Sequence, residues 1–127
     1  MYLPIYLPVF KENIEKHSNL KRFTERKINS ILEHPYNSES LKYALSGLRS
    51  CPVRRNYLII FGILEEHKKC NFEFGFNLEV LKDYDDKTII FLIFGPHDDA
   101  YKIAKKMAEI GMLSDPNLEN LPTNKIK

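Results

Sequence analysis

Residues 57–64 read YLIIFGIL, and residues 88–94 read TIIFLIF. Both runs consist almost entirely of aliphatic, aromatic and β-branched side chains, and neither contains a charged residue. Continuous apolar runs of this length are typical of strands buried on both faces of a sheet, because an exposed face requires polar residues at alternate positions. The two segments are therefore predicted to be the central strands of the domain.

The stretch between these two predicted strands has a different composition. Residues 72–80, FEFGFNLEV, alternate apolar residues with polar residues or glycine at a period of two, which predicts an additional, half-exposed strand. Residues 63–86 also contain seven acidic residues against three lysines. We interpret about 65–86 as an acidic insertion whose added strand has an exposed edge, through which the protein could form a homodimer.

Helical patterns flank the predicted central strands. Apolar residues recur at helical spacing over residues 10–34 and end at His34-Pro35, which predicts a helical hairpin. The same spacing over residues 100–110, followed by Gly111, predicts a C-terminal helix. Pro4 and Pro8 limit the first ten residues to an edge strand, because proline has no N–H to donate. The fold class is thus predicted to be α+β, a small antiparallel β-sheet with an N-terminal helical hairpin and a C-terminal helix.

The length and composition indicate one domain. The chain has 127 residues, of which 43% are apolar and 28% charged, so it can bury a core. We predict a single domain over residues 1–111 and a loosely ordered tail over 112–127. No apolar run reaches the ~18 residues of a membrane span and no signal-peptide pattern is present, so we expect a cytoplasmic protein without a membrane partner. Cys51 and Cys70 are interpreted as reduced thiols.

The net charge of +2 conceals an uneven distribution. Residues 63–86 carry −4, so the remaining 103 residues carry +6. A modestly basic scaffold of this kind is compatible with a phosphate-containing partner. The pair His67 and Cys70 has a spacing found in zinc sites, but no second donor pair accompanies it, and no glycine-rich phosphate loop or dinucleotide fingerprint is present. We therefore predict neither a metal nor a cofactor.

Three segments, taken in order, resemble a known family. Residues 41–50 read LKYALSGLRS, residues 53–61 read VRRNYLIIF, and residues 93–102 read IFGPHDDAYK. The first two are similar to the "lkGLRS" and "vgdYRiiY" signatures of RelE/ParE-type toxins, and the third resembles the closing "iGHRkdvYk" of that family. The match extends over roughly residues 6–106 with one insertion.

The resemblance implies two kinds of activity. RelE-type members cleave messenger RNA in the ribosomal A site, whereas ParE-type members inhibit DNA gyrase and are not nucleases. Members of both branches are neutralised by a cognate antitoxin protein that wraps around the toxin. The expected partners are accordingly an antitoxin and mRNA on the ribosome, and residues 72–80 could accept an added antitoxin strand.

Individual residues can be matched to the family motifs. Arg49 occupies the arginine position of "GLRS", Tyr57 the strand tyrosine, and Tyr101 the tyrosine of "dvY". Two positions depart from the pattern. Leu58 replaces the arginine that contacts phosphate in the nucleases, and Pro96-His97 replaces the His-Arg pair of "GHR".

Metal-independent RNA cleavage needs a base for the ribose 2′-hydroxyl, positive charge at the phosphate and an acid for the leaving oxygen. Histidine suits both proton transfers near neutral pH, which makes His97 the principal candidate. Arg54 and Arg55 could supply the charge, and strand alternation places Arg54 on the Leu58 face if the strand begins that early. Tyr101 could stack on a base. The predicted catalytic set is His97, Arg54, Arg55 and Tyr101, and the predicted RNA-binding set is Arg49, Lys42, Tyr57 and Lys102.

Three interpretations remain open. The leading one is a RelE-type endoribonuclease that acts on ribosome-bound mRNA and inhibits translation. The alternative, favoured by Leu58, is a binding protein of the same fold without nuclease activity, either gyrase-directed or a degenerate toxin. In the third, the motif match is coincidental and the chain is an unrelated α+β domain.

Overall fold

One mixed sheet organises the chain in the computed structural model, which describes residues 1–70, 72 and 74–109. Within these residues the strand order is β1-β5-β4-β3-β2. The predicted α+β class is confirmed. The predicted tail, 112–127, lies outside the described residues. The strands are β1 (Leu3–Tyr6), β2 (Glu39–Ser40), β3 (Leu48–Val53), β4 (Tyr57–Ile63) and β5 (Thr88–Pro96).

The two predicted central strands are β4 and β5, and both faces of each are covered. Ile59, Phe61 and Ile63 of β4 pack into one hydrophobic cluster, whereas Leu58 and Ile60 pack into a second cluster on the opposite face. Burial on both sides explains why neither run contains a charged residue.

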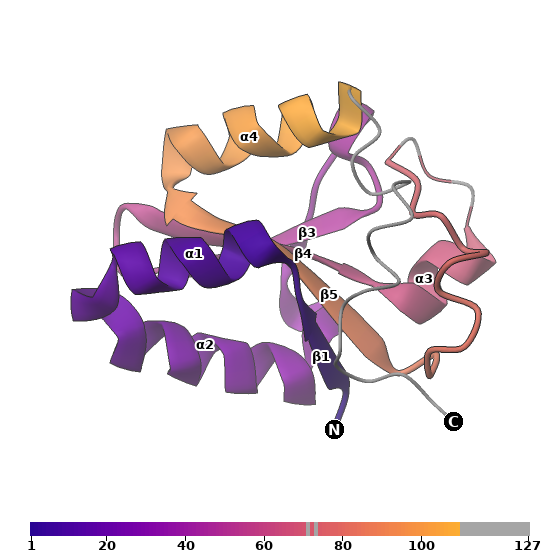
Figure 1. Cartoon of the computed structure of the whole chain (residues 1–127), viewed down its shortest axis with the longest axis horizontal. Coiled ribbons are helices and arrows are strands. Elements are labelled where there is room, and N and C mark those ends of the chain that lie inside the picture. The colour runs from indigo at the N-terminus through magenta and orange to yellow at the C-terminus, as the bar shows by residue number, and fades with distance from the viewer. Residues whose placement is uncertain (71, 73, 110–127) are drawn as a thin grey trace.

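Helices cover the two faces unequally (Figure 1). The helical hairpin, α1 and α2, contributes Phe10, Ile28 and Ile31 to one cluster, which lies on the helical-hairpin face of the sheet. α4 contributes Ala104 and Met107 to the other, which we call the α4-side cluster. The predicted hairpin and C-terminal helix are therefore confirmed. None of the helices in the described part of the chain is both long and apolar enough to cross a membrane. The helices are α1 (Pro8–Lys16), α2 (Lys21–Glu33), α3 (Leu64–Lys69) and α4 (His97–Glu109), with short 3₁₀ turns at Ser18–Leu20, Pro35–Asn37 and Tyr43–Leu45.

The prediction of an antiparallel sheet is only partly right, because the edge strand β1 runs parallel to β5. The Leu3 N–H donates to the Lys87 carbonyl at 2.7 Å, and the Leu7 N–H donates to the Phe91 carbonyl at 3.1 Å. The backbone N–H groups of the odd-numbered residues of β1 thus point toward β5. The backbone nitrogen of Pro4 points away from the sheet, where the missing N–H leaves no hydrogen bond unmade. This position explains how a proline is accommodated in the strand.

A β-bulge in β5 adjusts the packing between the two faces. Ile60 pairs with Ile93, but the next residue, Phe61, pairs with Phe91, so Leu92 is an extra residue. Leu92 and Ile93 consequently both contribute to the α4-side cluster. The bulge leaves Phe91 and Phe94 together on the helical-hairpin face.

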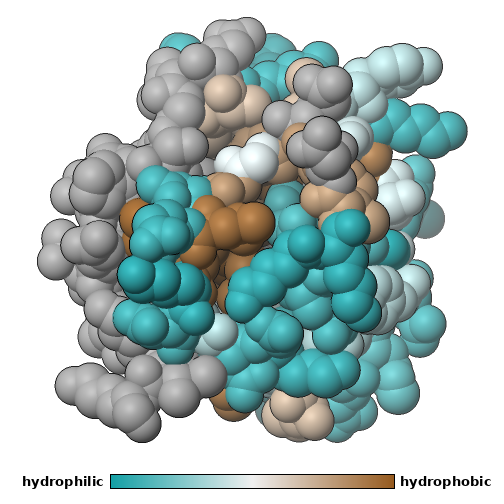
Figure 2. All heavy atoms as spheres, turned by 90° about the vertical axis from the view of Figure 1, so that its right-hand side faces the viewer, coloured by the Kyte–Doolittle hydropathy of each residue, from teal (hydrophilic) through white to brown (hydrophobic). Residues whose placement is uncertain are grey.

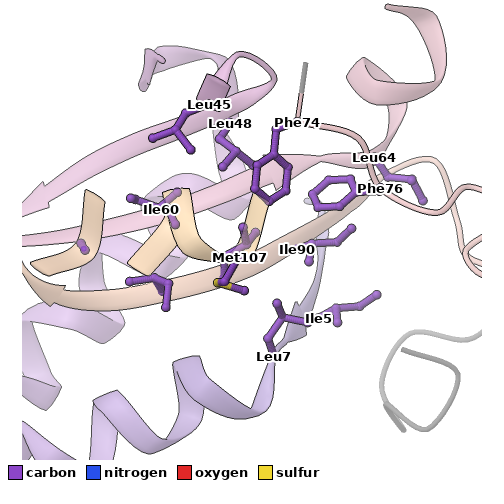
Figure 3. Packing of buried hydrophobic residues seen from close by; sticks show 14 of the residues in the cluster. Ile5, Leu7, Leu45, Leu48, Ile60, Leu64, Phe74, Phe76, Ile90 and Met107 are labelled. Atoms are coloured by element: carbon purple, nitrogen blue, oxygen red, sulfur yellow. The ribbon is translucent and has the colours of Figure 1, made fainter. Parts of the chain in front are cut away.

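The prediction of a strand at residues 72–80 is wrong, because none of the described residues of this segment belongs to a strand. Phe74 and Phe76 point into the α4-side cluster (Figure 3), so their alternation reflects burial without strand pairing. The chain then reverses at Asn77, whose Oδ1 accepts the Glu79 N–H at 3.1 Å. The proposed homodimer and the added antitoxin strand thereby lose the strand on which both predictions rested.

The acidic segment lies at the α3 end of the sheet, on the right of Figure 1. Figure 2 views this end, where hydrophilic side chains cover much of the described surface. Glu79, Asp83 and Asp86 are exposed. The negative charge is thus at the opposite end of the sheet from the β3–β4 turn and the start of α4.

Candidate nucleic-acid interface

The predicted catalytic residues lie at the same end of the sheet. Arg54 and Arg55 lie in the turn between β3 and β4, and His97 begins α4 directly after β5. Tyr57 pairs with Pro96 in the β4–β5 register, and the His97 N–H donates to the Asn56 carbonyl at 2.8 Å. The backbone therefore fastens the arginine-containing turn to the histidine.

His97 and Tyr101 form one half of this end, on the α4 side. The His97 side chain is 54% exposed, and its Nδ1 lies 3.8 Å from the Asp98 carboxylate. Its ring meets the Tyr101 ring edge-on, with centroids 5.0 Å apart. Lys102, the next residue of α4, is exposed. The imidazole is thus accessible and supported on one side by an aromatic ring.

Arg54 points to the other face. Because β4 begins at Tyr57, Arg54 lies in the turn, and the condition under which it would share the Leu58 face is not met. Its backbone has a φ of +58°, in the left-handed region that non-glycine residues rarely adopt. Its guanidinium carbon lies 4.4 Å from the centroid of the Phe23 ring in α2. Arg55 is exposed, and no carboxylate of the described residues forms an ion pair with either arginine.

Tyr57 connects the turn to a histidine that the sequence pattern did not indicate. The Tyr57 hydroxyl lies 3.5 Å from His17 Nδ1, and the two rings are 5.0 Å apart. Tyr57 also stacks on Phe94 at 5.6 Å. His17 follows α1 and has no motif around it. Only the packing of α1 against the sheet brings His17 to this end.

An open depression lies between the β3–β4 turn and the 3₁₀ turn that joins α1 to α2. No residue of its lining carries a negative charge. Its lining residues are Leu20, Arg54, Arg55, Asn56 and Tyr57. We refer to this depression as the turn depression.

Arg49 and Lys42 are not part of this end. Arg49 pairs with Phe61 in the sheet, four residues before Val53 and about 13 Å from it. Its guanidinium forms an ion pair with Glu66 at 2.8 Å and donates to the Ser38 carbonyl at 2.7 Å. Lys42 is exposed and precedes the 3₁₀ turn Tyr43–Leu45, which contacts α4. The Arg49 side chain is therefore engaged in holding α3 to the sheet.

Leu58 occupies the position at which the toxin signature has an arginine, and it is only 3% exposed within the α4-side cluster. The sheet face beneath α4 is apolar at this point. Phosphate binding there would require a cation that Leu58 and its neighbours in the cluster do not supply.

His67 is a core residue. It is 6% exposed, its Nε2 lies 2.6 Å from the Gly47 carbonyl, and its ring packs 4.2 Å from that of Phe76. Burial lowers the pKa of His67 and outweighs the hydrogen bond to Gly47. In the part of the chain that is described, no three histidine, cysteine or acidic side chains are grouped so that they could hold a metal ion.

Comparisons with known proteins returned few matches. No protein-family model matches the chain, and no curated protein matches its sequence. Among solved structures, the chain is similar to the conserved hypothetical protein HP0894 from Helicobacter pylori, with a TM-score of 0.40 and 16% identity over 77% of this chain and 97% of that chain.

Proposed function

We propose that the protein is a RelE-type toxin, an endoribonuclease that cleaves ribosome-bound mRNA without a metal ion and is neutralised by a cognate antitoxin. The observation that carries the proposal is the 2.8 Å hydrogen bond from the His97 N–H to the Asn56 carbonyl. It joins a solvent-accessible imidazole to a turn with two arginines that no carboxylate of the described residues neutralises.

Each role follows from the chemistry of strand cleavage. His97 accepts the proton of a ribose 2′-hydroxyl, whose oxygen attacks the adjacent phosphorus and expels the 5′-oxygen of the next nucleotide. The protonated imidazole then returns this proton to the leaving 5′-oxygen. Arg55 stabilises the charge that accumulates on the phosphate oxygens. Tyr101, edge-on to His97, stacks on a neighbouring base. The products are a 2′,3′-cyclic phosphate and a 5′-hydroxyl.

The test is a translation reaction assembled from purified components, with mRNA ends mapped by primer extension. We expect wild-type protein to cut the message, with cleavage by His97→Ala reduced about 100-fold or more, as for loss of a general acid–base group. His34→Ala is the matched control, because His34 is exposed at the end of α2, away from this site.

Intact messages with the wild-type protein, or equal cleavage by His97→Ala, would contradict the catalytic assignment. Loss of cleavage by His34→Ala as well would indicate a general effect of the substitutions.

A second candidate is a protein of the same fold that binds its target without cleaving it, such as a gyrase-directed or degenerate toxin. The burial of Leu58 favours it, because the apolar sheet face offers no arginine to the phosphate. Growth inhibition that persists in His97→Ala cells with intact mRNA would support this candidate. Expression without any effect on growth would support the degenerate form.

A further inference from the structure

We infer that the turn depression, together with the loop joining α1 and α2, binds the phosphate backbone of single-stranded RNA. The inference rests on the proposed function for the identity of the ligand but does not require cleavage. It places a binding surface on the helical-hairpin side of the sheet end, on the opposite face from Tyr101 and α4.

Positive charge is concentrated in the two chain segments that meet at the depression. Residues 16–22, KHSNLKR, contain three cationic residues and a histidine, and residues 52–58, PVRRNYL, contain two arginines. Neither segment contains an acidic residue. Leu20 from the first segment and Arg54 and Arg55 from the second line the same depression, so the cations of the lining are the two arginines of the β3–β4 turn. The cations of residues 16–22 are neighbours of Leu20 in the sequence.

The geometry of Arg54 suits a phosphate ligand. Its guanidinium carbon lies 4.4 Å from the centroid of the Phe23 ring, and an arginine placed over an aromatic ring can still donate two parallel hydrogen bonds to phosphate oxygens. The free face of a guanidinium can also stack on a base. Asn56 and the Tyr57 hydroxyl supply further hydrogen-bonding groups in the lining. An acidic peptide would use the charge but not the planar face.

The backbone conformation of Arg54 makes glycine a suitable replacement for testing its side chain. A left-handed φ of +58° is unfavourable for a non-glycine residue, whereas glycine adopts it readily. A long cationic side chain at this position lowers stability locally, as residues at binding sites often do. Replacement by glycine therefore separates the side chain's contribution to binding from its contribution to folding.

The experiment measures binding of a short fluorescein-labelled single-stranded RNA by anisotropy, in a full-length His97→Ala background that removes cleavage. We expect Arg54→Gly to weaken binding about tenfold while the melting temperature stays equal or rises. Arg54→Lys should weaken it about threefold, because charge remains and the planar fork is lost. A plot of log association constant against log salt concentration has a negative slope, and this slope should become shallower by about 0.7 for each phosphate contact removed.

Lys69→Gln is the matched control, because Lys69 is exposed on α3 at the opposite end of the sheet. It should change affinity less than twofold. Unchanged binding by Arg54→Gly at an unchanged melting temperature would overturn the inference, and so would competition by polyglutamate as effective as competition by unlabelled RNA. Because the assay requires no cleavage, a protein that binds RNA here but fails to cut mRNA would contradict only the proposed nuclease.

Discussion

Glu65 illustrates how single side chains hold the α3 end of the sheet. Its carboxylate accepts hydrogen bonds from the hydroxyls of Tyr2 and Tyr36 and lies 3.4 Å from the Lys87 ammonium. These partners come from the chain start, the turn after α2 and the loop before β5. Partial burial raises the pKa of Glu65, but the two hydroxyls and Lys87 outweigh it, so the pKa lies below its usual value.

The lowered pKa predicts a pH-dependent contribution to stability. A carboxyl whose pKa is lower in the folded state stabilises the fold above its unfolded pKa, about 4.3, and this contribution is lost as the pH falls through the folded value. Wild-type protein should therefore lose melting temperature on acidification below about pH 5 more steeply than Glu65→Gln. Scanning calorimetry from pH 7 to pH 3.5 checks this. Parallel curves for the two proteins would show that Glu65 makes no such contribution.

At the level of elements, the sequence predicted those strands and helices in which burial produces a regular pattern of apolar residues. The strands β4 and β5 were predicted from their apolar runs, and the helices α1, α2 and α4 from the helical spacing of their apolar residues. β3 was not assigned as a strand, because Ser50 and Pro52 interrupt its apolar residues, and α3 is too short for a period to emerge. At the candidate site, the grouping of Arg54 and Arg55 with His97 was expected from the family resemblance and the chemistry of cleavage. The proximity of His17 to Tyr57 could not be anticipated, because it depends on how α1 packs.

The pattern at residues 72–80 has a different explanation. Phe74 and Phe76 stand at alternate positions in the sequence because both rings are buried in the core. The Phe76 ring occupies the space next to Gly62 that a side chain of β4 would otherwise fill. A Cβ atom at Gly62 would lie 2.6 Å from the Phe76 ring. Glycine at this strand position thus makes room for the inserted segment.

We predict that Gly62→Ala lowers the free energy of unfolding by about 1–3 kcal/mol through overpacking. Urea denaturation monitored by circular dichroism measures the change. The double variant Gly62→Ala/Phe76→Leu should show a favourable coupling of about 1 kcal/mol or more relative to the sum of the single variants. Gly95→Ala is the control, because a Cβ atom at that position would have no neighbour among the described residues within 4 Å. Additive effects at positions 62 and 76 would refute the direct contact.

For the whole molecule, the main feature is the separation of charge along the sheet. The arginine turn and the start of α4 lie at one end, and the acidic segment lies at the other (Figure 1). The seven residues of β4 between them span about 23 Å. This distance exceeds the Debye length of about 8 Å at physiological ionic strength but not the length of about 30 Å at 0.01 M salt.

The separation predicts a salt-dependent effect of distant charge. Replacing Glu79 and Asp83 by Gln and Asn should increase RNA affinity about twofold at 0.01 M salt and leave it unchanged at 0.15 M, because screening removes the repulsion. The anisotropy assay described above provides the measurement. An equal increase at both salt concentrations would mean that the acidic segment lies close to the bound RNA.

The parallel pairing of β1 with β5 has a consequence for folding during synthesis. Residues 3–6 pair with residues 88–91, and β4 pairs with the same strand from its other side. β5, which lies between β1 and β4 in the sheet, is thus the last strand to be translated among the described residues. Contacts between such distant segments close slowly, so the nascent chain holds an unpaired first strand until β5 leaves the ribosome. The end of the sheet that contains His97 is assembled in that same step, so the arginine turn and His97 come together only after β5 has been translated and has paired with both of its neighbours.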